Sequence, residues 1–137
     1  MAAAKIAGRP LLLVTAALIF FAVATYLGVN ERVYDISTVG RRPGGIFLRK
    51  AVSVIVFAVA GIFSETLAAP RPSRGLKRPT VAALGGFLLS AVIEFFQYPE
   101  AAEDILLDLG CGLAGGTLGH AVLRLAAKVR ARRGASH

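Results

Sequence analysis

Charged residues are scarce in this chain of 137 residues. Only 18% of the residues are charged, whereas 55% are hydrophobic, and the mean hydropathy is +0.65. A soluble domain carries about 25% charged and about 45–50% apolar residues. The apolar residues also fall into four blocks, which polar segments rich in proline and arginine separate. This distribution argues against a soluble domain and predicts a multi-pass membrane protein with one domain, residues 1–137.

Cysteine is nearly absent, because Cys111 is the only one in the chain. A single cysteine excludes an internal disulfide, and no cysteine or histidine pair has the spacing of zinc ligands. The sequence also lacks a Walker-type glycine loop, a nucleophile elbow and a His-Glu-x-x-His motif. We therefore expect no metal and no cofactor. Whether the protein is an enzyme stays open, and the lack of a complete catalytic set favours a non-enzyme.

Acidic residues are few, with 8 against 16 lysines and arginines, and the net charge is +8. Such an excess can indicate nucleic-acid binding. Here, however, most basic residues lie between or beyond the apolar blocks, and no basic amphipathic helix is expected apart from them. We therefore predict no nucleic-acid partner, and attribute the charge to membrane topology and to contact with anionic lipid in the bilayer.

The four apolar blocks predict four transmembrane helices, since about 20 apolar residues cross a hydrocarbon core of about 30 Å as a helix. Short connections between helices make neighbours antiparallel. The expected fold is an all-α, antiparallel four-helix transmembrane bundle. The predicted segments are helices over about 10–29, 46–69, 80–98 and 104–123, followed by a basic cytoplasmic tail over 124–137.

The first apolar block has a second interpretation as a cleaved signal peptide. Ala22-Val23-Ala24 resembles the small-residue site at which such a peptide is cut. The apolar run continues beyond Ala24 to Leu27, however. This continuation favours an uncleaved membrane anchor.

The orientation of the bundle follows from the distribution of lysine and arginine. If there are four spans, two of these residues in the N-terminal segment, four in the linker at 70–79 and five in the tail share one side of the membrane. The other side has five, in and beside the first loop. Because cytoplasmic segments carry the excess of basic residues, both ends of the chain are predicted to be cytoplasmic.

Among the carboxylates in the predicted spans, Glu94 and Asp108 are the two best candidates for a functional role. Each costs at least about 2.5 kcal/mol in the bilayer unless it has a partner or a purpose. Glu94 lies four residues before the turn and Asp108 four or five after it, so both are expected about 6 Å below the outer surface. Helical spacing adds neighbours on the same faces. The predicted polar cluster opens to the extracytoplasmic side and comprises Ser90, Glu94, Gln97, Asp104 and Asp108.

Two kinds of role are open for this cluster. Close carboxylates raise each other's pKa, so the group can act as an acid or base, relay protons or bind a hard cation. Alternatively, the carboxylates only hold the bundle together through Gln97, Ser90 or a loop arginine. At the ends of the spans, Lys50 is expected to extend outward to the interface, Glu65 to be a boundary carboxylate, and His120 to be an interfacial polar residue.

The fourth block is rich in glycine and contains two overlapping small-residue motifs. In membranes, small side chains let helices approach closely. The favoured interpretation is packing within one chain, and dimerisation is the alternative. The expected packing residues form two Gly-x-x-x-Gly pairs, Gly112 with Gly116 and Gly115 with Gly119.

The segment Ser-Ala-Val-Ile-Glu-Phe-Phe-Gln over 90–97, followed by Asp104 and a glycine-rich helix, resembles the VanZ-like family of small membrane proteins. Glu94 and Gln97 match the family's Glu-x-x-Gln pair, and Asp104 matches its aspartate. Asp108 stands where the family usually has asparagine. The loop after Gln97 is short and lacks the family's arginine, a charge that the first loop could supply from Arg32, Arg41 or Arg42.

The resemblance implies a multi-pass protein of the bacterial cell (inner) membrane, associated with resistance to the glycopeptide teicoplanin. Its ligand would be a glycopeptide, a lipid-linked molecule or a cell-wall molecule, bound at the outward-facing cluster. Two alternatives stay open. One is an accessory subunit that binds a membrane protein or a second copy through the glycine-rich helix. The other is a small proton or cation transporter.

Overall fold

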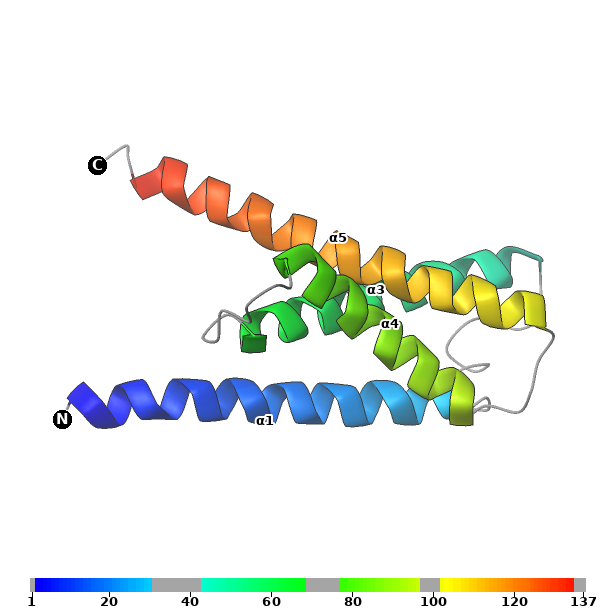
Figure 1. The fold of residues 1–137 in the computed structure, drawn as a ribbon, viewed down its shortest axis with the longest axis horizontal. Helices are drawn as coiled ribbons and strands as arrows, with labels where there is room; N and C mark the ends of the chain where they lie inside the picture. The colour runs from blue at the N-terminus through cyan, green and yellow to red at the C-terminus, as the bar shows by residue number, and fades with distance from the viewer. Residues whose placement is uncertain (1, 31–42, 69–76, 97–101, 135–137) are drawn as a thin grey trace.

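The computed structural model describes residues 2–30, 43–68, 77–96 and 102–134, with side chains over 11–30, 48, 50–68, 77–96 and 105–134. These residues form four α-helices, as the apolar blocks predicted (Figure 1). Each helix is long and apolar enough to cross a membrane. The helices are α1 (Ala2–Val29), α3 (Pro43–Ala68), α4 (Arg78–Phe96) and α5 (Ala102–Gly134).

The largest difference from the predicted boundaries is at α5, which continues to Gly134 instead of ending near residue 123. The basic tail predicted over 124–137 is therefore helical over most of its length. Residues 124–133 are arginine, lysine, leucine, alanine and one valine. Apart from the valine these are strong helix formers, and no proline or glycine interrupts them. A basic helical segment thus follows the last apolar block, which the sequence analysis did not expect.

All four helices begin earlier than predicted. The start is Ala2 rather than near residue 10 in α1, and Pro43 rather than residue 46 in α3. In α4 and α5 the shift is two residues, to Arg78 and Ala102. Proline is tolerated in the first turn of a helix, because the backbone N–H that it lacks has no partner there. Pro43 and the two glycines after it thus form the first turn of α3.

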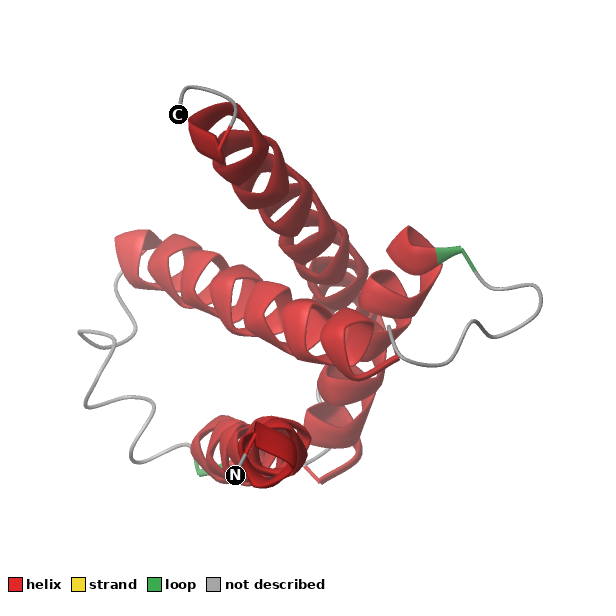
Figure 2. Cartoon of the chain, turned by 90° about the vertical axis from the view of Figure 1, so that its left-hand side faces the viewer, coloured by secondary structure: helices red, strands yellow, loops and turns green. Residues whose placement is uncertain are grey.

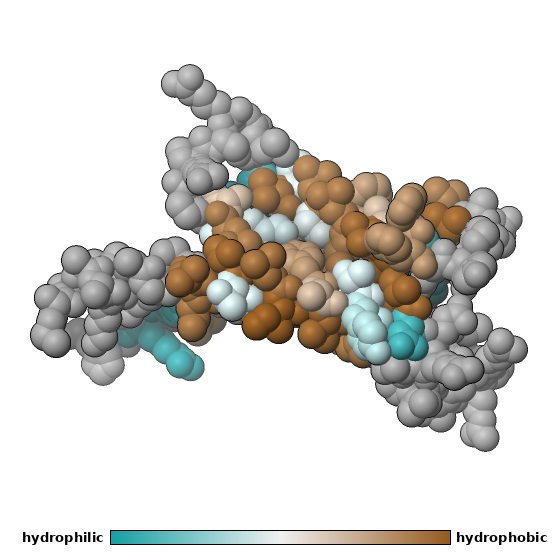
Figure 3. Space-filling model, turned by 90° about the horizontal axis from the view of Figure 1, so that it is seen from below, coloured by the Kyte–Doolittle hydropathy of each residue, from teal (hydrophilic) through white to brown (hydrophobic). Residues whose placement is uncertain are grey.

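Helix α1 lies beside α3 and α4, and among the described residues it makes no contact with α5. Figure 2, seen nearly along α1, shows this helix set below the others. Its inner contacts include the rings of Phe20 and Phe63, whose centroids are 5.4 Å apart. Most of its large apolar side chains are exposed, and apolar residues cover the centre of the face that Figure 3 shows. Such a surface suits contact with lipid.

Helices α3, α4 and α5 pack against one another through small residues. Glycine and alanine occupy the contact positions, so the backbones approach closely. A Cβ atom built on Gly116 would lie 2.8 Å from the Cα atom of Ala83 in α4, and one built on Gly61 would lie equally close to the Cα of Gly116. Close packing of small residues takes the place of a hydrophobic driving force in a membrane.

The contacts fix the register of these three helices. Along α3 and α5 they advance in the same order, from Lys50 with Asp108 to Glu65 with His120. Along α4 and α5 they advance in opposite order. The α4 contacts pair Ala82 with Gly116, Gly86 with Gly112, and Ser90 with Asp108.

Candidate functional site

Asp108 is the centre of a polar group where α3, α4 and α5 meet. Its carboxylate forms an ion pair with the ammonium group of Lys50 on α3. Its backbone carbonyl oxygen accepts a hydrogen bond of 2.8 Å from the hydroxyl of Ser90 on α4. Ser90 is fully buried, whereas the side chains of Lys50 and Asp108 are 27% and 18% exposed. One residue of α5 is thus tied to both neighbouring helices.

The lysine partner of Asp108 corrects two predictions. Lys50 was expected to extend outward to the interface, but its ammonium group turns to the carboxylate of α5. The group around Asp108 therefore contains a positive charge and is not purely acidic. Away from water, the attraction between opposite charges offsets part of the cost of removing each from solvent, so the lysine and the carboxylate pair with each other.

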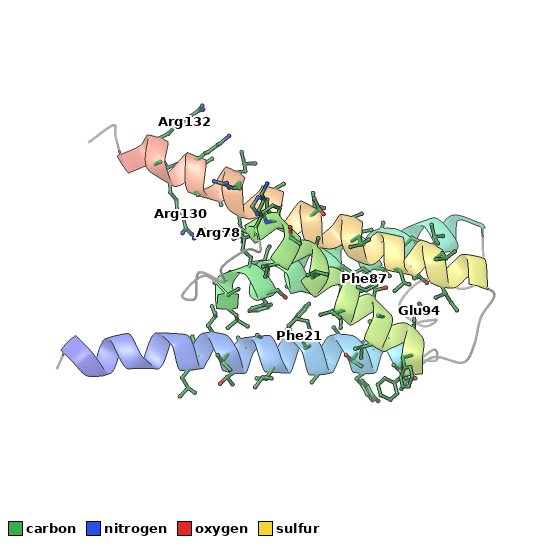
Figure 4. The ribbon with its side chains drawn as sticks, in the orientation of Figure 1. Phe21, Arg78, Phe87, Glu94, Arg130 and Arg132 are labelled. Atoms are coloured by element: carbon green, nitrogen blue, oxygen red, sulfur yellow. The ribbon has the colours of Figure 1, made fainter. Side chains whose placement is uncertain are left out.

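Glu94 lies one turn nearer the end of the bundle than Asp108, not at the same depth. The hydrogen bond places Ser90 level with Asp108. Glu94 is four residues further along α4 than Ser90, and four residues of helix rise about 6 Å. By the same spacing, Glu94 is level with position 104 of α5, about 6 Å from the level of Asp108. The reason is that α4 is helical to Phe96 and α5 begins at Ala102, each two residues from the predicted boundary. Figure 4 shows Glu94 near the end of α4, and it has an interaction partner of its own.

The structure therefore brings together part of the predicted cluster. Ser90 and Asp108 are in contact, and Glu94 follows one helical turn beyond Ser90 on α4. Gln97 and the side chain of Asp104 lie outside the described residues, as do Arg32, Arg41 and Arg42. We keep the name polar cluster for Lys50, Ser90, Glu94 and Asp108.

A second polar pair, which the sequence analysis did not find, joins α3 to α5 near their other ends. Nδ1 of His120 lies 2.8 Å from Oε2 of Glu65, and their side chains are only 15% and 8% exposed. Glu65 is thus buried and not a boundary carboxylate, and His120 faces α3 rather than the interface. A signal for both pairs was present. Lys50 and Glu65 are 15 residues apart, and Asp108 and His120 are 12 apart, so each helix carries two polar positions at similar separation.

The Glu65–His120 hydrogen bond gives a testable contribution to stability. Replacing Glu65 by leucine leaves the imidazole without its buried partner, and we expect the free energy of unfolding in detergent to fall by about 1–3 kcal/mol. The exposed Thr117 bonds only to the carbonyl of Leu113 in its own helix, so Thr117→Ala is the control and should change stability by less than about 0.5 kcal/mol. Equal effects of the two variants would show that the pair does not stabilise the fold.

The glycines of α5 pack against α3 and α4 of the same chain. All four predicted packing glycines are buried: Gly112 and Gly116 face α4, and Gly115 and Gly119 face α3. A Cβ built on Gly112 would lie 2.8 Å from the Cβ of Ser90, so the missing side chain at 112 leaves room for the hydroxyl that bonds Asp108. The small-residue face of α5 is thus occupied by the protein's own helices.

Within the described part of the chain, polar groups are well satisfied. Each buried side-chain nitrogen or oxygen atom there has a hydrogen-bond partner. Those residues contain no group of three histidine, cysteine, aspartate or glutamate side chains that could hold a metal ion. Through Lys50, Ser90 and Asp108 the polar cluster offers hydrogen bonding and charge recognition.

Comparison of the chain with family models, with curated proteins and with solved structures found no match. The four helices, each long and apolar enough to span a membrane, are the observation that indicates a multi-pass membrane protein.

Proposed function

We propose that the chain is a four-span antiparallel bundle with both ends in the cytoplasm, in a bacterial inner membrane. The start of α1 and the end of α5 lie toward the same side in Figure 1, which supports an even number of crossings. The orientation rests on the count of lysines and arginines alone, with eleven on the proposed inner side and five on the outer side.

We further propose that the protein is a VanZ-like cell-envelope protein whose polar cluster binds the polar part of an envelope ligand. The observation that carries this proposal is the pairing of Asp108 with Lys50 in a site that three helices build. A charge pair between membrane helices is costly and commonly marks a functional site. Because both side chains are partly exposed, an anionic group of a ligand can compete with Asp108 for the lysine.

Glu94 has a distinct place in this proposal. It lies one turn closer to the outer end of α4 than Ser90, so a ligand that enters from outside meets Glu94 before the ion pair. A carboxylate at that position can accept hydrogen bonds from hydroxyl, amide or ammonium groups of a glycopeptide or a lipid-linked sugar. The Glu-x-x-Gln pattern that the VanZ-like resemblance rests on begins at this residue.

Two of the alternatives lose support. An accessory subunit was expected to bind its partner through the glycine-rich face of α5, but α3 and α4 cover that face. Transport of a hard cation was expected to use paired carboxylates, but Asp108 already has a bound ammonium group. Recognition of a polar ligand requires neither.

The test compares two carboxyl-to-amide substitutions at opposite ends of the bundle. Cells that express the wild-type protein are expected to tolerate teicoplanin better than cells without it. Glu94→Gln should abolish this difference at unchanged membrane abundance, because the carboxylate that meets the ligand is lost. Glu65→Gln makes the same chemical change away from the cluster and should retain the phenotype at matched abundance. If both variants, or neither, lose it, the cluster is not the functional site.

A further inference from the structure

The C-terminal part of α5 extends far beyond the small-residue core. With 33 residues, α5 is about 50 Å long, whereas the hydrocarbon core of a bilayer is about 30 Å thick. In Figure 1 its last turns pass well beyond the ends of α3 and α4 that lie on the same side. All residues from Arg124 to Gly134 are exposed. This segment, residues 124–134, is called the basic extension.

The basic extension carries charge of only one sign. It has five basic residues and no acidic one, and Lys77 and Arg78 at the start of α4 add two more exposed basic residues. Figure 4 shows Arg130 and Arg132 projecting from different sides of the helix. Glu65, the carboxylate described near this end, is buried against His120. The five basic residues are Arg124, Lys128, Arg130, Arg132 and Arg133.

An apolar stripe continues into the same segment. Leu118, Val122, Leu125 and Val129 follow one another at intervals of four, three and four residues, and so share one face of the helix. Their exposed fractions lie between 42% and 64%. A helix that combines an exposed apolar stripe with surrounding basic residues is typical of segments that bind a membrane surface.

We propose that the basic extension docks on the anionic headgroups of the bilayer surface that α5 leaves. The apolar stripe contacts the boundary between headgroups and acyl chains, and the basic side chains contact the phosphates. Each basic residue held close to an anionic surface contributes to the attraction. This inference is independent of the polar cluster, which lies at the opposite end of α3 and α5.

Charge complementarity selects lipid over a second copy of the chain. The spacing of the stripe also suits a two-stranded coiled coil, with valine and leucine alternating along the seam. In a parallel pair, however, Lys128 of one copy would face Arg133 of the other, at the positions that flank the seam. Both residues are positive. Two copies of a segment with five positive charges repel each other, whereas anionic phospholipid is attracted.

The test measures lipid selectivity of the full-length protein by native mass spectrometry. The protein is taken from mixed micelles with equal parts of phosphatidylglycerol and phosphatidylcholine. We expect the wild type to retain phosphatidylglycerol in preference. Replacing Arg124, Lys128, Arg130 and Arg132 by glutamine should reduce that preference about tenfold or more, and raising the salt concentration should also weaken it. The matched control replaces the three arginines among them by lysine, keeps the charge and should keep the preference.

Three results would overturn the proposal. The first is that the wild type does not discriminate between the two lipids, and the second is that the glutamine variant keeps the wild-type preference. The third is that the wild type forms a dimer without lipid preference, which Leu125→Gln and Val129→Gln separate into monomers. The last result would make the stripe an interface between copies. The substituted residues are exposed, and the lysine control keeps their charge. Because all variants are compared as folded protein of the expected mass, a lost lipid preference is distinguished from a lost fold.

Discussion

Replacing Gly116 by alanine is expected to destabilise the protein by about 1–3 kcal/mol, through overpacking of a close helix contact. A Cβ atom at this position would collide with the carbonyl oxygen of Ala82 and would lie 2.8 Å from the Cα of Ala83. Both contacts are with backbone, which cannot rotate away as a side chain can. Helices α4 and α5 would therefore have to move apart, with loss of contacts on either side of the substitution.

Gly110 provides the matched control for this substitution. It lies on the same helix, is exposed, and has no atom within 4 Å of the place that a Cβ would take. Gly110→Ala should leave stability unchanged or raise it by up to about 1 kcal/mol, since alanine favours helix over glycine. Unfolding of both variants in mixed micelles with increasing dodecyl sulfate measures the difference. Equal stability of the two variants would contradict the close packing of α4 against α5.

The second large effect is expected at the ion pair of Lys50 and Asp108. Removing one partner leaves the other charged group in a site that is only partly exposed, so Lys50→Gln and Asp108→Asn should each cost about 1–3 kcal/mol. Loss of a fully buried pair would cost more, and the exposed fractions of 27% and 18% place this pair below that limit. The double substitution removes both charges. Its loss of unfolding free energy should therefore be smaller than the sum of the losses in the two single variants.

A double-mutant cycle measures this coupling directly. We expect an interaction energy of about 1–2 kcal/mol between positions 50 and 108, from unfolding of the wild type, both single variants and the double variant. Asp108→Asn leaves the ammonium group of Lys50 without its carboxylate partner. It should therefore be tolerated best when Lys50 is also replaced by a neutral residue. Additive effects would mean that the two charges do not stabilise each other.

The membrane helices were predictable because the bilayer imposes a fixed length on an apolar run. Composition and block length placed all four helices, although each begins earlier than expected and α5 ends later. The continuation of α5 to Gly134 was missed because the basic residues were taken as a sign of a tail outside the membrane. Arginine, lysine, leucine and alanine all have high helix propensity, which predicts that the helix continues through this segment.

The polar contacts were harder to predict, because they depend on the register between helices. A shift of two residues at each end of the α4–α5 connection moved Glu94 and Asp108 one turn apart. Lys50 was assigned to the interface because a lysine at the end of an apolar block usually extends there. Its pairing with Asp108 depends on α3 lying beside α5, which the sequence does not show. Glu65 and His120 were each assigned to the membrane interface for the same reason.

The most direct test of the central claim is the side of the membrane on which each end of the bundle lies. In a Cys111→Ser background, single cysteines replace Glu100, between α4 and α5, and Arg132, in the basic extension. A membrane-impermeant maleimide applied to intact spheroplasts is expected to label position 100 at once, and position 132 only after the membrane is permeabilised. Labelling of position 132 in intact spheroplasts, with position 100 protected, would contradict both the orientation and the outward-facing polar cluster.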